Sequence, residues 1–106
     1  MNQYTPEAWR LLRIQYEGEQ IVKLFAGWYG GYLGADHWRL SSGVKEVVDD
    51  GEYWNVINHS GSVYKCHKQT ERMTGLMASV YASMNEQTTV ELLTTEEYLA
   101  AQTTRA

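Results

Sequence analysis

Turn-forming residues divide the middle of this 106-residue chain into short β-type segments, and this pattern constrains the fold more than any other feature. Asp49-Asp50-Gly51 predicts a three-residue link with glycine at the left-handed position. Asn58-His59-Ser60-Gly61 predicts another tight turn, and Ser41-Ser42-Gly43 predicts a bend or bulge. Residues 37–67 are therefore expected to form an antiparallel β-meander. Its expected strands are His37–Leu40, Val44–Val48, Glu52–Asn58 and Ser62–His67.

The segment before this meander can be interpreted in two ways. Thr5-Pro6-Glu7 has the residues that cap and start a helix, which would then occupy residues 9–16. Against the helix, side chains alternate along 11–16, and Glu17-Gly18-Glu19 is a turn composition. The β-branched and aromatic run Ile21–Phe25 follows directly. We favour a hairpin here and keep the helix as the alternative.

An amphipathic helix is expected from about Thr70 to Asn85, because six apolar residues recur there with the spacing of one helix face. Thr70 is the expected cap, with Glu71 in the first turn. Residues 88–93 are consistent with a short strand, and Thr94 or Thr95 with the cap of a brief helix through Ala101. The apolar positions of the main helix are Met73, Leu76, Met77, Val80, Tyr81 and Met84.

These elements predict one α+β domain over residues 1–106, with an antiparallel sheet of about five strands, the main helix packed on one face and a short C-terminal helix. A chain of this length buries enough surface for one core without disulfide staples. A strip of small side chains on the main helix would let another backbone approach. We expect the C-terminal segment to occupy it, with a dimer mate as the alternative. The strip consists of Gly75, Ser79 and Ser83, flanked by Ala78 and Ala82.

The charge and composition exclude several classes of function. The formal net charge is −4, and the basic residues are mostly scattered, which disfavours direct binding to nucleic acid. The N-terminal residues do not resemble a signal peptide, and no stretch is long and apolar enough for a membrane span. The single cysteine, Cys66, cannot form an intrachain disulfide. We therefore expect a cytoplasmic protein, active as a monomer or homodimer, with no membrane partner.

Chemistry-bearing residues are few. His59, Cys66 and His67 lie close in sequence, but neighbours on a strand point to opposite faces, and no paired ligand spacing is present. A free cysteine beside Tyr64 is more typical of a core than of a nucleophile. We expect no catalytic residue, no metal and no cofactor. A small enzyme or ligand-binding domain that uses His59, Cys66 or His67 is the alternative.

The aromatic residues are the most informative feature for function. The chain has 8 tyrosines and 4 tryptophans but 1 phenylalanine, so nearly every aromatic ring carries a polar group suited to a half-buried position. Several rings flank the glycine-rich segment 27–34, a composition typical of binding loops. The expected partner-binding residues are Trp28, Tyr29, Tyr32, Asp36, His37 and Trp38, with Asp49, Asp50 and Glu52 at the hairpin tip as a second patch.

Three stretches carry a resemblance that extends over residues 20 to 70. Residues 26–33 (AGWYGGYL), 38–43 (WRLSSG) and 58–68 (NHSGSVYKCHK) resemble small uncharacterised proteins carried by bacteriophages and prophages. The resemblance implies an accessory role in a phage–host contest, for example as an inhibitor of bacterial defence of the anti-CRISPR type. Such inhibitors are small and non-enzymatic, and they occlude a host protein. The modest acidity of this chain argues against a nucleic-acid mimic.

The expected function is therefore that of a non-enzymatic protein-binding module. Its partner would be a host protein or protein complex, blocked by steric occlusion. A virion-associated homo-oligomer is a further alternative, built on the small-residue strip of the main helix.

Overall fold

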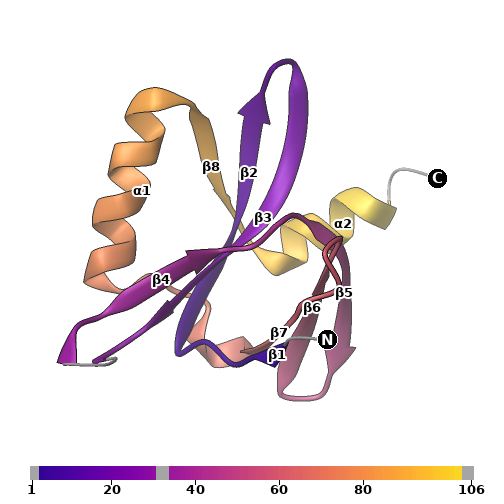
Figure 1. Cartoon of the computed structure of the whole chain (residues 1–106). Coiled ribbons are helices and arrows are strands. Elements are labelled where there is room, and N and C mark those ends of the chain that lie inside the picture. The colour runs from indigo at the N-terminus through magenta and orange to yellow at the C-terminus, as the bar shows by residue number, and fades with distance from the viewer. Residues whose placement is uncertain (1–2, 31–33, 104–106) are drawn as a thin grey trace.

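The computed structural model describes residues 3–30 and 34–103, which form two four-stranded sheets and two α-helices (Figure 1). The first sheet, called here the central sheet, has the strand order β4-β3-β2-β8. The second, called the outer sheet, has the order β1-β7-β6-β5. The central strands are β2 (Ala8–Tyr16), β3 (Glu19–Trp28), β4 (His37–Leu40) and β8 (Thr89–Leu93). The outer strands are β1 (Gln3–Tyr4), β5 (Val44–Asp50), β6 (Tyr53–Asn58) and β7 (Val63–His67), and the helices are α1 (Gly75–Gln87) and α2 (Thr95–Thr103).

The long β2–β3 hairpin forms the middle of the central sheet. The two strands pair from Ala8 with Gly27 to Tyr16 with Glu19, so only Glu17 and Gly18 form the turn. Both turn residues have positive φ angles, 48° and 80°, as a two-residue hairpin turn requires. The expected hairpin is therefore confirmed over residues 8–28, and the alternative helix at 9–16 is wrong. Ala8, Trp9, Leu11 and Leu12 are all buried, so both faces of β2 are covered at this end of the hairpin.

Each face of the central sheet packs against a different layer. Trp9, Leu11 and Leu24 belong to a cluster shared with the outer sheet and with Tyr98 of α2. Leu12 and Phe25, on the other face, form a second cluster with Met77 of α1. The α+β class, with the main helix on one face and a short C-terminal helix, is thus confirmed. Among the described helices, none is both long and apolar enough to cross a bilayer.

The division into two sheets differs from the single five-stranded sheet expected from the sequence. Strand β4 pairs with β3 rather than with β5, so the meander comprises β5, β6 and β7 alone. The link at Ser41-Ser42-Gly43 carries the chain from one sheet to the other. Ser41 donates its backbone N–H to Leu24 O at 2.9 Å, and its Oγ accepts the Leu24 N–H at 2.9 Å. The serine side chain thus takes over part of the ladder as the strand turns away.

Several boundaries also differ from the expectations. The β5–β6 turn contains two residues, Gly51 and Glu52, since Asp50 already pairs with Tyr53. Helix α1 starts later than expected, and its cap is Thr74 rather than Thr70: Thr74 Oγ1 accepts the Met77 N–H at 3.1 Å. The other expected elements are confirmed, namely the turn after Asn58, strand β8, and the α2 cap, which the Thr94 side chain provides.

Candidate binding groove between two sheet edges

An open groove of about 580 Å³ lies where an edge of the outer sheet approaches an edge of the central sheet. One wall is the N-terminal strand β1, and the other is β4 with the end of β3. Three of the predicted partner-binding residues line it, Trp28, His37 and Trp38. The full lining is Gln3, Tyr4, Thr5, Trp28, His37, Trp38 and Arg39.

Side-chain stacking fixes the two walls of the groove. The His37 ring lies flat on Trp28, with centroids 5.0 Å apart and planes 7° apart. The Arg39 guanidinium lies over the Tyr4 ring at 4.6 Å, and Tyr4 in turn stacks on the buried Tyr64 at 4.8 Å. Because the rings hold these side chains in place, little rotamer entropy is left to lose when a ligand binds.

Arg39 gives the groove its positive charge. No carboxylate of the described residues forms an ion pair with it, although both Arg13 and Lys68 have such partners. Burial raises the pKa of Tyr64, while the charge of Arg39 acts in the opposite direction. An exposed, stacked guanidinium without a carboxylate partner is suited to binding an anionic group through its fork of donors.

Polar contacts hold Trp28 and Tyr29 against the N-terminal residues. Trp28 donates its Nε1–H to Thr5 O at 3.0 Å, and Glu7 Oε1 accepts the Tyr29 N–H at 3.0 Å. Asp36 Oδ1 accepts the Gly30 N–H at 2.9 Å, which fastens the base of the loop.

Two other predicted partner-binding residues near Trp28 do not line the groove. Asp36 is engaged in the loop, whereas Tyr29 is 44% exposed beside the groove without lining it. Tyr32 lies outside the described residues.

The acidic hairpin tip is separate from the groove. It lies on β5 and the β5–β6 turn, and β7 and β6 stand between β5 and the β1 wall of the groove. Asp49 is paired with Lys68 at 2.7 Å, and this hydrogen bond lowers the pKa of its carboxyl group. Asp50 accepts a hydrogen bond from Asn55 at 3.3 Å, and Glu52 is exposed in the turn. The structure therefore does not unite the two predicted patches.

Tyr4 and Arg39 are the lining residues that the sequence analysis missed. Tyr4 reaches the groove because β1 adds in parallel to β7, with Tyr4 opposite Tyr64. A two-residue parallel strand leaves no periodic signal in a sequence. Arg39 could have been found, because it alternates with Trp38 on a predicted strand and therefore shares a face with His37.

The residues considered for chemistry have structural contacts. Cys66 is fully buried, its Sγ lies 3.6 Å from Tyr64 O, and burial raises the pKa of its thiol. His67 Nδ1 accepts the Gln69 N–H at 3.1 Å, and its ring packs edge-on to Tyr53. His59 is exposed in the turn after β6. Within residues 3–30 and 34–103, no group of three or more histidine, cysteine or acidic side chains is placed to hold a metal ion.

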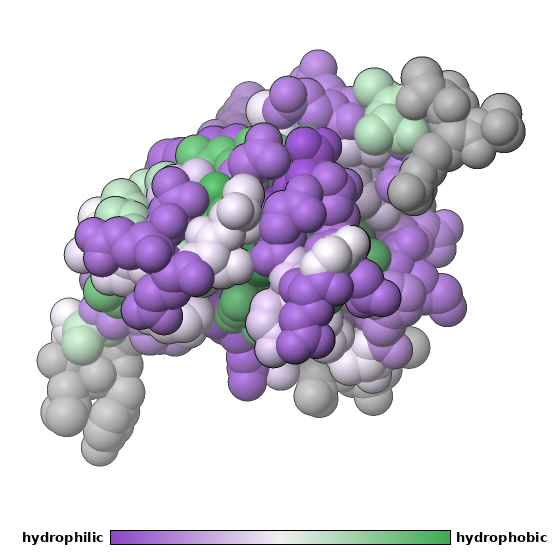
Figure 2. Space-filling model, turned by 90° about the horizontal axis from the view of Figure 1, so that it is seen from above, coloured by the Kyte–Doolittle hydropathy of each residue, from purple (hydrophilic) through white to green (hydrophobic). Residues whose placement is uncertain are grey.

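A second hollow, of about 720 Å³, lies beneath the tip of the β2–β3 hairpin and is bounded by the end of α1. Ile14, Ile21 and the exposed Tyr16 contribute apolar surface to it. On the molecular face viewed from above, hydrophobic surface forms small areas between hydrophilic side chains (Figure 2). Glu17 and Lys23, which carry opposite charges, also line this hollow, so it has no single sign of charge.

The small-residue strip of α1 was expected to be covered by the C-terminal segment, and that expectation is wrong. All five of its residues are exposed, and a Cβ added at Gly75 would meet nothing within 4 Å. The C-terminal helix α2 instead packs through Tyr98 into the cluster between the sheets, on the other face of the central sheet.

Comparison with known proteins finds no match: no family model, no curated protein and no solved structure is similar to this chain.

Proposed function

We propose that this chain is a non-enzymatic protein-binding module whose contact surface is the groove between β1 and β4. The observation that carries the proposal is the stacked, unpaired Arg39 in a groove walled by Trp28, His37 and Tyr4. Tryptophan, tyrosine and arginine are the residue types that dominate the binding energy of protein interfaces. We take the partner to be a protein, because the net charge is −4 and the basic residues are mostly scattered along the sequence, which disfavours nucleic acid.

Inhibition of a host defence complex by steric occlusion is the form of this function that the resemblance to phage accessory proteins implies. The resemblance supplies the class of partner, and the groove supplies a surface that could block it. We expect the bound host protein to lose its own contacts with other macromolecules. An assay of the captured partner's activity, with and without the chain in excess, measures this directly.

Capture with matched variants tests the binding proposal. The wild-type chain, Arg39→Glu, His37→Ala and Tyr16→Ala are immobilised and incubated with the same bacterial lysate. Arg39→Glu reverses the charge of the groove, and His37→Ala removes the ring that is stacked on Trp28. Tyr16→Ala removes a ring that is 60% exposed at the other hollow and serves as the control. We expect the wild type and Tyr16→Ala to retain a common stoichiometric partner that both groove variants lose.

The folding of each variant is checked by urea unfolding before capture. Arg39→Glu gives up the cation–π contact with Tyr4 at an exposed site, so it should cost about 0.5–1 kcal/mol. His37 is exposed but stacked on Trp28, so His37→Ala should cost about 0.5–1 kcal/mol. If a folded Arg39→Glu variant retains the same partner as the wild type, the groove is not the contact surface.

A further inference from the structure

We infer that the partner binds as an extended segment that adds a strand to the free edge of β4, with a carboxylate side chain opposite Arg39. This inference rests on the proposed function and specifies how the groove is occupied. Addition of a strand supplies affinity through main-chain hydrogen bonds and specificity through alternate side chains.

The hydrogen bonds of the ladder show which groups of β4 are free. Leu24 and Ser41 form a hydrogen-bonded pair, since the Ser41 N–H donates to Leu24 O at 2.9 Å. Bonded and non-bonded pairs alternate in an antiparallel ladder, so His37 and Arg39 also bond to β3. The backbone N–H and C=O groups of Trp38 and Leu40 therefore point away from β3. Among the described residues no other strand pairs with β4, which leaves these groups available to an added strand.

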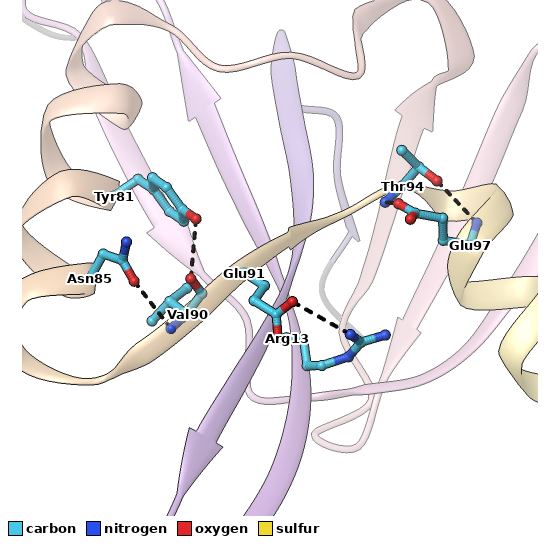
Figure 3. Close-up of polar contacts among 7 residues, drawn as sticks. All are labelled: Arg13, Tyr81, Asn85, Val90, Glu91, Thr94 and Glu97. Carbon is cyan, nitrogen blue, oxygen red and sulfur yellow. Dashed lines mark hydrogen bonds and ion pairs between the residues drawn. The ribbon is translucent and has the colours of Figure 1, made fainter.

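The opposite edge of the same sheet is closed by side chains. Val90 of β8 faces α1, where its N–H donates to Asn85 Oδ1 at 3.5 Å and its carbonyl accepts from the Tyr81 hydroxyl at 3.1 Å (Figure 3). Arg13 and Glu91 form an ion pair across β2 and β8 at 3.8 Å. A strand could not pair with Val90 at this edge without displacing its two contacts with α1.

The edges of the outer sheet are also poorly suited to a partner strand. Strand β5 has a bulge between Val44 and Glu46 and carries exposed charged residues, features that hinder edge pairing. Strand β1 is two residues long. Among the described strands, β4 combines a regular register with outward groups that have no bond of their own.

The charge of the groove favours an acidic occupant. His37 and Arg39 share the face of β4 that looks toward Tyr4, since alternate residues of a strand lie on one face. A residue opposite Arg39 on an added strand would sit in a non-bonded pair, where the Cβ atoms lie about 4.5–5.5 Å apart. A carboxylate at that position reaches the guanidinium while the fork stays stacked on Tyr4.

The same geometry disfavours a second copy of this chain as the occupant. Antiparallel pairing of two β4 strands with Trp38 opposite Trp38 would place His37 opposite Arg39. Pairing with Trp38 opposite Leu40 would place Arg39 opposite Arg39. The second register places like charges directly opposite one another, which destabilises a strand pair, and the first register gives Arg39 no carboxylate. A different chain with an acidic residue therefore fits this edge better.

Amide hydrogen exchange, followed by NMR, tests the inference on the wild-type protein. The probe is a short peptide of alternating threonine and valine with one central glutamate, and the matched probes carry glutamine or lysine in its place. We expect the glutamate peptide to protect the Trp38 and Leu40 amides from exchange. The Arg39 amide, already bonded to β3, serves as the internal control. We expect affinity to fall in the order glutamate, glutamine, lysine, with about tenfold between the first and the last.

Two variants separate the backbone from the side chain. Leu40→Pro removes an outward N–H without removing a bond to β3, and edge strands tolerate proline at such positions. Leu40→Ala removes the same side chain but keeps the N–H. We expect Leu40→Pro to bind the glutamate peptide about fivefold more weakly than Leu40→Ala.

The outcomes distinguish this inference from the proposed function. Shifts of groove resonances without protection of the Trp38 and Leu40 amides would mean that the groove binds a partner by another mode, and the inference would be overturned while the proposed function stands. Equal binding of the glutamate and lysine peptides would also overturn it. If no peptide shifts a groove resonance, the inference fails, and the capture experiment decides the proposed function separately.

Discussion

A methyl group at Gly27 is expected to break the contact between α1 and the central sheet. Gly27 lies on β3 opposite Trp38, and a Cβ built there would overlap the sulfur of the fully buried Met77. Met77 cannot move freely, because its backbone N–H donates to Thr74 Oγ1 at 3.1 Å and its sulfur lies 3.4 Å from the Thr74 N–H. Gly27→Ala should therefore destabilise the protein by about 1–3 kcal/mol, the usual cost of overpacking a core.

A double-mutant cycle tests whether this clash is the cause. Met77→Ala alone should cost about 2–5 kcal/mol through the cavity it leaves. The double variant Gly27→Ala/Met77→Ala should be more stable than the sum of the two costs predicts, by at least about 1 kcal/mol, because the new methyl group occupies part of that cavity. Urea unfolding followed by tryptophan fluorescence gives the free energies.

The control is Gly75→Ala, which adds the same methyl group in open space in the first turn of α1. It should be neutral or stabilising by up to about 1 kcal/mol. Costs that add within about 0.5 kcal/mol in the cycle, or a Gly75→Ala variant as unstable as Gly27→Ala, would refute the reasoning.

Two further predictions concern titratable groups. Because the Lys68 hydrogen bond lowers the pKa of Asp49 below its ordinary value of 3.8, its contribution to stability is present at neutral pH and lost as the pH falls through the folded-state pKa. The difference in unfolding free energy between wild type and Asp49→Asn should therefore shrink on acidification in urea titrations at successive pH values, and a pH-independent difference would contradict the pairing. Burial raises the pKa of Cys66, so iodoacetamide at mildly alkaline pH should label it only in denaturant, as followed by mass spectrometry, whereas rapid labelling of the native protein would restore the enzyme alternative.

The local elements of this fold could be predicted from the sequence, because turns and periodicity are local. The tip at Glu17-Gly18 needs positive φ at both positions, and the glycine there is visible in the sequence. The apolar spacing around Met77 likewise identified the main helix. The predicted helix start was wrong because Thr70 and Thr74 are both good caps. The choice depends on a tertiary contact: the Glu71 carboxylate, between the two, accepts the N–H and hydroxyl of Thr95 at 2.9 Å.

The pairing of the strands and half of the groove could not be predicted. Residues 37–40 have a strand pattern whether β4 joins β3 or β5, and the hydrogen bonds of Ser41 with Leu24 decide between them only in the folded chain. Trp28, His37 and Trp38 were identified from composition. Tyr4 enters the site through its pairing with Tyr64, from the far end of the chain. A site made where two sheets meet is specified by long-range packing, which periodicity does not record.

The charge on the free edge of β4 could also serve only to prevent pairing with another sheet. The geometry of Arg39 and His37 argues against this explanation. Charged residues on edge strands commonly prevent one sheet from adding to another, and Arg39 could serve that purpose alone. Such a role requires only a mobile, solvated charge. Arg39 instead stands 4.6 Å over a ring that is itself stacked on a buried tyrosine, and His37 lies flat on Trp28. Ordering these two side chains costs conformational entropy, and repulsion between edges does not require that order. The fixed placement of both groups beside the unbonded backbone of Trp38 therefore favours recognition of a partner strand over simple protection of the edge.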